Sequence, residues 1–215
     1  SCRNADVQSA VAETDDPGRL IQQAATMLET GDLILRTGND FSSEQVRDLS
    51  KTEKTYSHGG IVYRDSGKCL VYHVEPDYYH ISDKVRKEPL DSFLNPEHNL
   101  GFAVGRYELD SGEKKALIDY LEEQFSKKTP FDMDFSLETD DQLYCSEMIR
   151  KGLYRASSGR ILIKADKLDD RNKYKLIKRY FKLPEQRFAN REVIAIDQLY
   201  LNPHCRILKR FKFAP

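Results

Sequence analysis

The sequence predicts an α+β fold in which an antiparallel sheet is flanked by helices. Two strand-like runs within residues 60–75 are joined by the turn Asp65-Ser66-Gly67-Lys68, which is typical of a β-hairpin. Segments of helical periodicity lie between strand-like runs without the regular strand–helix–strand alternation of a parallel Rossmann sheet. With 215 residues, 39% of them hydrophobic, the chain is long enough for a domain with its own core.

The N-terminal part of the sequence predicts a leader followed by a helix. Residues 1–16 are small and polar without periodicity, so we expect a flexible leader. Asp15-Asp16-Pro17 is a typical helix start, because an Asp side chain can cap the first turn and Pro loses no hydrogen bond there. We expect Gly31 to stop this helix. The residues of its apolar face are Leu20, Ile21, Ala24, Met27 and Leu28.

Strand patterns dominate the next part of the chain. Leu33–Leu35 predicts a short buried strand, and Ser42–Gln45 resembles a capping box before a short polar helix. Residues 60–64 and 69–75 form the two strands of the hairpin. Side chains of the second strand alternate between two faces, with Leu70, Tyr72 and Val74 on one and Val71, His73 and Glu75 on the other.

The second half of the chain adds helices and two further strands. Phe102–Tyr107 predicts a strand, and Ser111–Lys128 predicts the longest helix. A loop then leads to Leu143–Ile149, the start of another helix. Val193–Ile196 predicts a short strand within a basic segment.

Several classes of protein are excluded by missing patterns. No run approaches the roughly 20 apolar residues of a transmembrane helix. The sequence has no Walker A, GxGxxG or GxSxG motif, so nucleotide-binding and serine-hydrolase functions have no support. The four cysteines lack the paired spacing of a zinc ribbon or a CxxC redox motif. They are Cys2, Cys69, Cys145 and Cys205.

One cysteine lies where its thiol could become a nucleophile. Cys145 is at the first turn of a predicted helix, where the helix dipole favours a thiolate. A thiol nucleophile also needs an imidazole base and a group that orients the imidazole. His58 enters a buried strand, and Gly59-Gly60 leaves room beside it for another backbone or a substrate. Glu75 ends the next strand, so strand pairing can bring it beside His58.

These residues carry a resemblance to a known family. The sequence resembles the circularly permuted branch of the NlpC-type papain-like superfamily, the YiiX-like group, in which the histidine strand precedes the cysteine helix. The resemblance covers roughly residues 18–155. Its motifs are Gly31-Asp32-Leu33-Ile34, Ser57-His58-Gly59-Gly60-Ile61, His73-Val74-Glu75 and Tyr144-Cys145-Ser146-Glu147.

The resemblance implies a fold and a set of roles. It implies a papain-like fold with permuted order, in which Cys145 is the nucleophile, His58 the general base and Glu75 the orienting residue. Tyr144 would lie near the oxyanion site. The glycines after His58 differ from the bulkier residues that the family often has there.

The resemblance also implies an activity. A cysteine hydrolase, acting as an amidase or peptidase through an acyl-enzyme, is expected on cell-wall peptides or on lipid-linked acyl groups. The alternative is a catalytically inactive papain-like module that binds lipid or glycan. An activity-based cysteine probe would separate the two, because a pure binding module should leave Cys145 unlabelled.

A metal site is the remaining alternative. His73, Glu75, Asp77 and His80 are all ligand types within a short stretch. Their spacing matches no HExxH or EF-hand pattern, and strand alternation followed by Pro76 would scatter them. We therefore expect neither a metal nor another cofactor.

The charges divide the chain unevenly. Residues 1–149 carry 16 Lys and Arg against 29 Asp and Glu, whereas residues 150–215 carry 18 against 6. We expect a leader (1–16), a permuted papain-like catalytic domain (17–155) and a basic extension (156–215) packed on the same domain. The alternatives for the extension are an anionic membrane surface and, with least support, nucleic acid.

The first residues suggest a location. Ser1-Cys2 before a polar stretch resembles what remains at a bacterial lipoprotein cleavage site, where the cysteine carries the lipid. This favours the cell envelope, periplasmic or lipid-anchored through Cys2. The alternative is a cytoplasmic protein.

Overall fold

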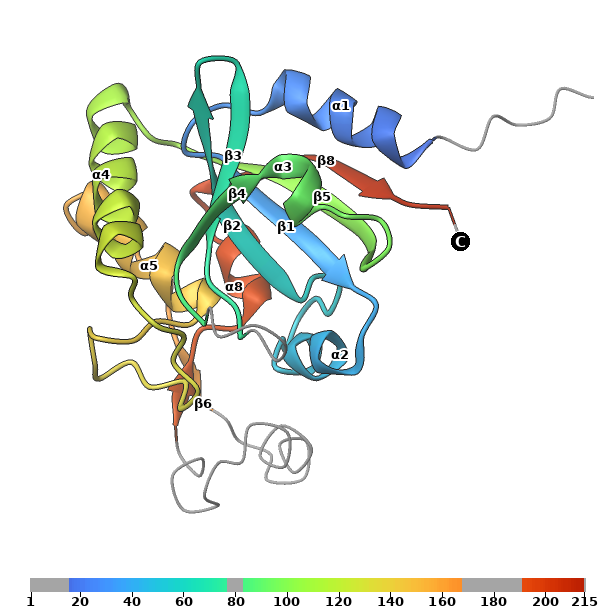
Figure 1. Cartoon of the computed structure of the whole chain (residues 1–215). Coiled ribbons are helices and arrows are strands. Elements are labelled where there is room, and N and C mark those ends of the chain that lie inside the picture. Colours follow the sequence, from blue (N-terminus) through green and yellow to red (C-terminus); the bar gives the residue numbers. More distant parts are fainter. Residues whose placement is uncertain (1–15, 77–82, 168–190, 215) are drawn as a thin grey trace, which may run out of the picture.

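The computed structural model describes residues 16–76, 83–167 and 191–214. In this part of the chain a six-stranded antiparallel sheet carries helices on both faces (Figure 1), which confirms the predicted α+β class. The strands follow one another in the order β4-β3-β2-β1-β5-β8. Their bounds are β1 (Leu33–Gly38), β2 (His58–Asp65), β3 (Lys68–His73), β4 (Arg86–Pro89), β5 (Asn99–Tyr107) and β8 (Cys205–Lys212).

The helices α4 (Ser111–Lys127) and α5 (Cys145–Ala156) lie against one face of the sheet (Figure 1). The helix α1 (Pro17–Met27) lies against the other face. The short strands β6 (Asp166–Lys167) and β7 (Glu192–Val193) pair with each other outside the main sheet. The helices are α1 (Pro17–Met27), α2 (Phe41–Asp48), α3 (Leu90–Phe93), α4 (Ser111–Lys127), α5 (Cys145–Ala156) and α8 (Ile196–Tyr200).

Alternation along the strands creates a core on each face. On β1, Leu33 and Leu35 face the side of α4 and α5, whereas Ile34 between them faces the side of α1 and α3. All three side chains are completely buried. Each such burial contributes about 1.5–3 kcal/mol, so the central strands are held from both sides.

The helix starts follow the predicted capping logic with one correction. Asp16 caps α1 by accepting the N–H of Arg19, and α4 begins with a capping box formed by Asp110 and Glu113. The capping box predicted at Ser42–Gln45 is wrong. Asp40 caps α2 instead, because its carboxylate accepts the N–H of Ser43.

Two predicted strands end earlier than expected. The strand β3 ends at His73, so Glu75 lies in the segment after the strand and not within it. Of the run Val193–Ile196, only Val193 is in a strand, and Ile196 begins α8. The Ala195 N–H donates to the side chain of Gln198 in that helix, which turns the chain away from strand pairing.

The basic C-terminal strand completes the sheet. β8 pairs with β5, and Phe211 stacks on Phe102 with ring centroids 4.4 Å apart. Arg210 forms an ion pair with Glu53. No helix among residues 16–76, 83–167 and 191–214 is long and apolar enough to cross a membrane. Several predictions fall outside the described residues: the leader 1–15 with Cys2, the candidate ligands Asp77 and His80, and the stretch 168–190.

Candidate active site

A cavity of about 600 Å³ opens between the start of α5, the end of β1, the start of β2 and the segment before α8. All four residues singled out from the sequence line it: Cys145, His58, Glu75 and Tyr144. They come from one helix start, one strand start and one loop that are far apart in the chain. The fold therefore gathers the predicted site residues around one cavity.

Cys145 is the first residue of α5 and is buried. Burial raises the pKa of its thiol to about 11, although the N–H groups of Ser146 and Gly59 donate hydrogen bonds to the sulfur and act in the opposite direction. The strand β3 pairs with β2 only from Ile61 onward, so no β3 residue pairs with Gly59. Within the described residues the hydrogen-bond partners of the thiol are these backbone groups and the Ser146 side chain.

Gly59 also lies close to Leu35 of β1 and to α5. A Cβ at this position would lie 3.3 Å from Leu35 and 3.5 Å from Ile149 of α5. The contact with Leu35 would be tight, whereas the distance to Ile149 is an ordinary van der Waals contact. The glycine after His58 thus mainly leaves room for Leu35 of β1 on this face.

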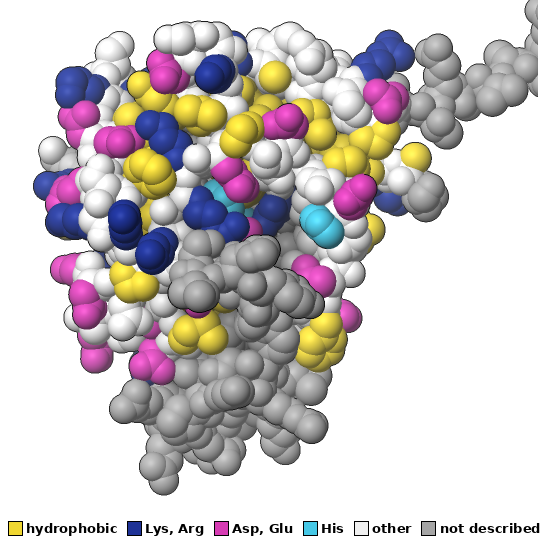
Figure 2. Space-filling model, viewed as in Figure 1, with side chains coloured by type: hydrophobic (Ala, Val, Ile, Leu, Met, Phe, Trp, Pro, Cys, Tyr) yellow, Lys and Arg dark blue, Asp and Glu magenta, His cyan; other side chains and the backbone are white. Residues whose placement is uncertain are grey.

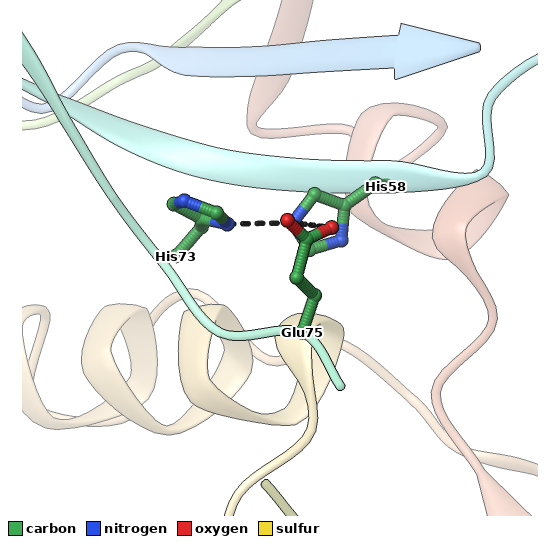
Figure 3. Close-up of side chains that lie close together, drawn as sticks. All are labelled: His58, His73 and Glu75. Carbon is green, nitrogen blue, oxygen red and sulfur yellow. Dashed lines mark hydrogen bonds and ion pairs between the residues drawn. The ribbon is translucent and has the colours of Figure 1, made fainter. Parts of the chain in front are cut away.

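His58 begins β2 opposite Arg36 of β1. Its Nε2 lies 3.0 Å from His73 Nδ1 and 3.8 Å from the Glu75 carboxylate (Figure 3). Burial lowers the pKa of His58 well below its usual value, although the Glu75 carboxylate acts in the opposite direction. At neutral pH the ring is therefore uncharged and can accept a proton.

Glu75 lies between positive charges. Arg36 contacts its carboxylate through a guanidinium N–H, and Arg86 lies 3.6 Å away. Burial opposes ionisation, but the positive charge around the carboxylate, that of Arg36 above all, outweighs it and holds the pKa of Glu75 well below its usual value. On the face shown in Figure 2, Lys and Arg side chains surround a histidine near the centre. Glu75 is therefore a permanent anion.

The residues on either side of Cys145 hold one wall of the cavity. The Tyr144 hydroxyl accepts the N–H of Ile194 at 2.9 Å, and the Ser146 hydroxyl donates to the Ile194 carbonyl at 2.6 Å. Tyr144 is almost completely buried, and burial raises its pKa well above the usual value. Its hydroxyl is thus a neutral group that fixes the segment before α8 over the cysteine.

The sequence reasoning missed three charged or titratable residues of this site. Arg36 and Arg86 neutralise Glu75, and Glu88 contacts His73. The strand alternation placed His73 on the same face as Glu75, which was a usable signal for that residue. The two arginines and Glu88 had no such signal, because their place beside the site depends on which strands pair.

A scan against family models now gives the family. Residues 27–199 match the model described as permuted papain-like amidase enzyme, YaeF/YiiX, C92 family. The chain belongs to this family. The match extends beyond residue 155, into the segment that forms the cavity wall around Ile194. The model describes amidase enzymes of the permuted papain-like fold, so the chain is a hydrolase of the cysteine peptidase or amidase type.

The search of solved structures agrees on the fold. The C92 chain is similar to a crystal structure described as metalloprotein yiiX from Escherichia coli O157:H7, with a TM-score of 0.67. The two are 22% identical, and the similarity covers 87% of this chain and 98% of the other. A search of curated proteins finds no match.

His58, His73 and Glu75 are residue types that can bind a metal ion. One ligand atom each from His58, His73 and Glu75 lies within 4.8 Å of the others, so these residue types could approach one cation. The carboxylate, however, is already neutralised by Arg36 and Arg86, and the two rings are hydrogen-bonded to each other. Two nearby guanidinium groups repel a divalent cation. The charges of this cluster therefore do not fit a resident metal.

Proposed function

We propose that this C92-family chain is a cysteine amidase that cleaves its substrate through an acyl-enzyme on Cys145. The observation that supports this most directly is the shared cavity: a thiol at a helix N-terminus and an uncharged imidazole line the same 600 Å³ space. A thiol with a pKa of about 11 is protonated at neutral pH, so the base must remove its proton during attack.

The reaction then follows from these protonation states. His58 takes the proton of Cys145 as the sulfur attacks the substrate carbonyl carbon and the carbonyl becomes an oxyanion. When the C–N bond breaks, His58 returns that proton to the leaving amine. Water then attacks the thioester carbonyl while His58 takes one of its protons. As the C–S bond breaks, His58 returns that proton to the Cys145 sulfur, and the acid product is released. Backbone N–H groups in the first turn of a helix have no carbonyl partner within it, so those at the start of α5 are suited to the oxyanion.

Glu75 supports the charge that forms on His58. Its carboxylate lies 3.8 Å from Nε2, a distance at which it stabilises an imidazolium by charge. Arg36 and Arg86 hold Glu75 ionised throughout the reaction. Tyr144 acts indirectly in this proposal, by fixing the wall segment at Ile194 beside the attacking sulfur.

The cavity walls favour an apolar acyl group among the amides that the family suggests. Of the two substrate groups considered, lipid-linked acyl chains would bury more apolar surface here than polar cell-wall peptides would. The apolar lining residues are Val46, Leu49, Phe131, Phe135, Val193, Ile194, Ala195 and Ile196. A panel of acyl amides and peptide amides, hydrolysed at equal concentration, would rank the two groups.

The test of the amidase proposal uses two pairs of variants. Cys145→Ala and His58→Ala should each abolish hydrolysis, whereas Cys69→Ser and Cys205→Ser should leave it unchanged, because neither thiol lines the cavity. Circular dichroism would confirm that all four variants fold. Hydrolysis near the wild-type rate in Cys145→Ala would overturn the mechanism. An intact protein that no cysteine-directed activity probe labels would favour the inactive binding module.

The location stays part of the proposal. A lipid on Cys2 would place the enzyme at the cell envelope, and mass spectrometry of the native protein would detect it. A Cys2 without lipid in a soluble fraction would favour the cytoplasmic alternative.

A further inference from the structure

A second imidazole contacts the His58 ring more closely than the Glu75 carboxylate does. His73 Nδ1 lies 3.0 Å from His58 Nε2, whereas the Glu75 oxygen lies 3.8 Å from the same nitrogen. The longer distance exceeds that of a hydrogen bond. The hydrogen-bond partner of the proposed base is therefore a histidine, and Glu75 acts on it by charge alone.

Glu88 of the edge strand β4 faces the other nitrogen of His73. Its Oε1 lies 2.9 Å from His73 Nε2, and the His73 side chain is completely buried. His73 Nε2 has no hydrogen-bond partner among the described residues, so the Glu88 carboxylate is the group that acts on it, at close range. Burial opposes ionisation of Glu88, but His73 outweighs it and lowers the pKa of Glu88. An ionised carboxylate only accepts protons, so it favours the form of His73 that carries hydrogen on Nε2.

We propose that His73 and Glu88 are positioning residues that set the tautomer of His58. This rests on the proposed function, in which His58 is the base. A His73 ring that carries its only hydrogen on Nε2 presents a lone pair at Nδ1. His58 must then donate its own Nε2 hydrogen to that lone pair. The free lone pair of His58 is therefore on Nδ1, and this is the atom that takes the proton of Cys145.

The packing around the two rings holds them in this arrangement. The ring of Phe93 lies against both, with centroid distances of 5.6 Å to His58 and 5.0 Å to His73. Gly60 lets β3 come close, because a Cβ there would lie 2.9 Å from the carbonyl oxygen of Tyr72 and 3.3 Å from His73 Cβ. Rotation of either ring would break the hydrogen bond between them, so the tautomers are coupled.

The first experiment reads the tautomers without any substrate. Protein with ¹⁵N-labelled histidine would be examined by NMR at pH 7.5, with signals assigned through single His→Gln variants. We expect the His58 signals of a hydrogen on Nε2 in the wild type and a tautomer mixture in Glu88→Gln. The matched control is Glu108→Gln, which removes the carboxylate 3.7 Å from His204, away from the cavity, and should change nothing at His58.

Two results of this experiment would overturn the proposal. One is a His58 hydrogen on Nδ1 in the wild type, and the other is a His58 tautomer that Glu88→Gln leaves unchanged. Added Zn²⁺ that shifts the His58 and His73 signals at stoichiometric concentration would also overturn it, because the cluster would then be a metal site. None of these readings depends on catalysis, so an inactive protein with the expected tautomers would refute only the amidase.

The second experiment separates positioning from packing. His73→Phe keeps a ring but removes the acceptor, and should lower kcat about 10- to 100-fold, the usual loss when the outer partner of a functional imidazole is removed. KM should stay close to the wild-type value. His73→Gln restores an acceptor oxygen and should recover most of the activity. Equal losses in the two variants, or no loss in His73→Phe, would contradict a positioning role.

Discussion

At the residue scale, burial and nearby charge give the Glu75 carboxylate, the His58 imidazole and the Cys145 thiol different protonation states. Glu75 is ionised because Arg36 and Arg86 outweigh its burial, whereas His58 is uncharged because burial outweighs Glu75. Burial also keeps the Cys145 thiol protonated, just as it keeps the His58 ring uncharged. The site therefore rests as thiol and imidazole, and the ion pair forms only during the reaction.

Removal of the Glu75 charge should slow the reaction without abolishing it. We expect Glu75→Gln to lower kcat/KM about 10- to 100-fold, which is about 1.4–2.7 kcal/mol of transition-state stabilisation. Its carboxylate stabilises the imidazolium by charge but makes no bond to substrate. Steady-state kinetics beside Cys145→Ala would measure this. A Glu75→Gln variant as inactive as Cys145→Ala would assign Glu75 a direct chemical role.

Stability should depend on pH through His58. Its pKa is depressed in the folded protein and close to 6.5 in the unfolded chain, so unfolding takes up a proton below about pH 6.5. Its contribution is complete above that pH and is lost as the pH falls toward the folded-state value. Melting temperatures from pH 7.5 down to pH 5 should therefore fall more steeply for the wild type than for His58→Gln. The exposed His98→Gln should keep the wild-type slope; equal slopes in all three proteins would refute this assignment.

At the element scale, the site depends on the close packing of α5 and β3 on β2 and on the attachment of the segment at Ile194. The helix α5 packs over Gly59, β3 packs beside Gly60, and the segment at Ile194 is held by Tyr144 and Ser146. A Cβ at Gly60 would clash with β3, and one at Gly59 would be in tight contact with Leu35 of β1. The geometry of the site is therefore set by glycines and hydroxyls that do no chemistry.

Gly60→Ala should disturb the site through strand packing. The added Cβ would lie 2.4 Å from Val71 and 2.9 Å from the Tyr72 carbonyl, so β2 and β3 must separate. Such overpacking costs about 1–3 kcal/mol, and we expect activity to fall as His73 moves away from His58. Urea unfolding and kcat would be measured together. Lys115→Ala at an exposed position of α4 is the control and should change stability by about 0.5 kcal/mol or less.

At the scale of the whole molecule, the C-terminal segment belongs to the structure that holds the site. The strand β8 completes the sheet, and residues 193–196 form part of the cavity wall. The Phe211 side chain of β8 and the Phe213 side chain just after it face the core that contains α1 and β5, and not solvent. The alternation of basic and aromatic residues in this strand therefore reflects a sheet edge with one buried face.

Loss of the aromatic contact at this edge should destabilise the whole protein. Phe211 is buried and stacks on Phe102, so Phe211→Ala should lower the free energy of unfolding by about 3–5 kcal/mol. Leu201→Ala is the control, because Leu201 is 46% exposed and should change stability by about 0.5 kcal/mol or less. Urea unfolding of both variants would measure this. A loss below that of the control would show that β8 does not stabilise the sheet.

Chelation should leave the enzyme unaffected. Arg36 and Arg86 occupy the carboxylate that a cation would need, so prolonged dialysis against EDTA should change neither hydrolysis nor melting temperature. Metal analysis of the dialysed protein gives the baseline. Activity lost on dialysis and restored by Zn²⁺ would contradict the assignment of this cluster as metal-free.

The sequence by itself predicted four of the six strands of the sheet and the four longest helices, and it singled out Cys145 and His58 as the proposed nucleophile and base, because these follow from local patterns. Alternation marked the hairpin, Asp-Pro marked the start of α1, apolar periodicity marked α5, and the order of His58 before Cys145 indicated the permuted family. Only the tertiary structure decided what surrounds those two residues. Arg36, Glu88 and Ile194 come from distant parts of the chain, and their contacts depend on strand order and register. Strand order and register are set by packing across the whole sheet, which no local pattern encodes.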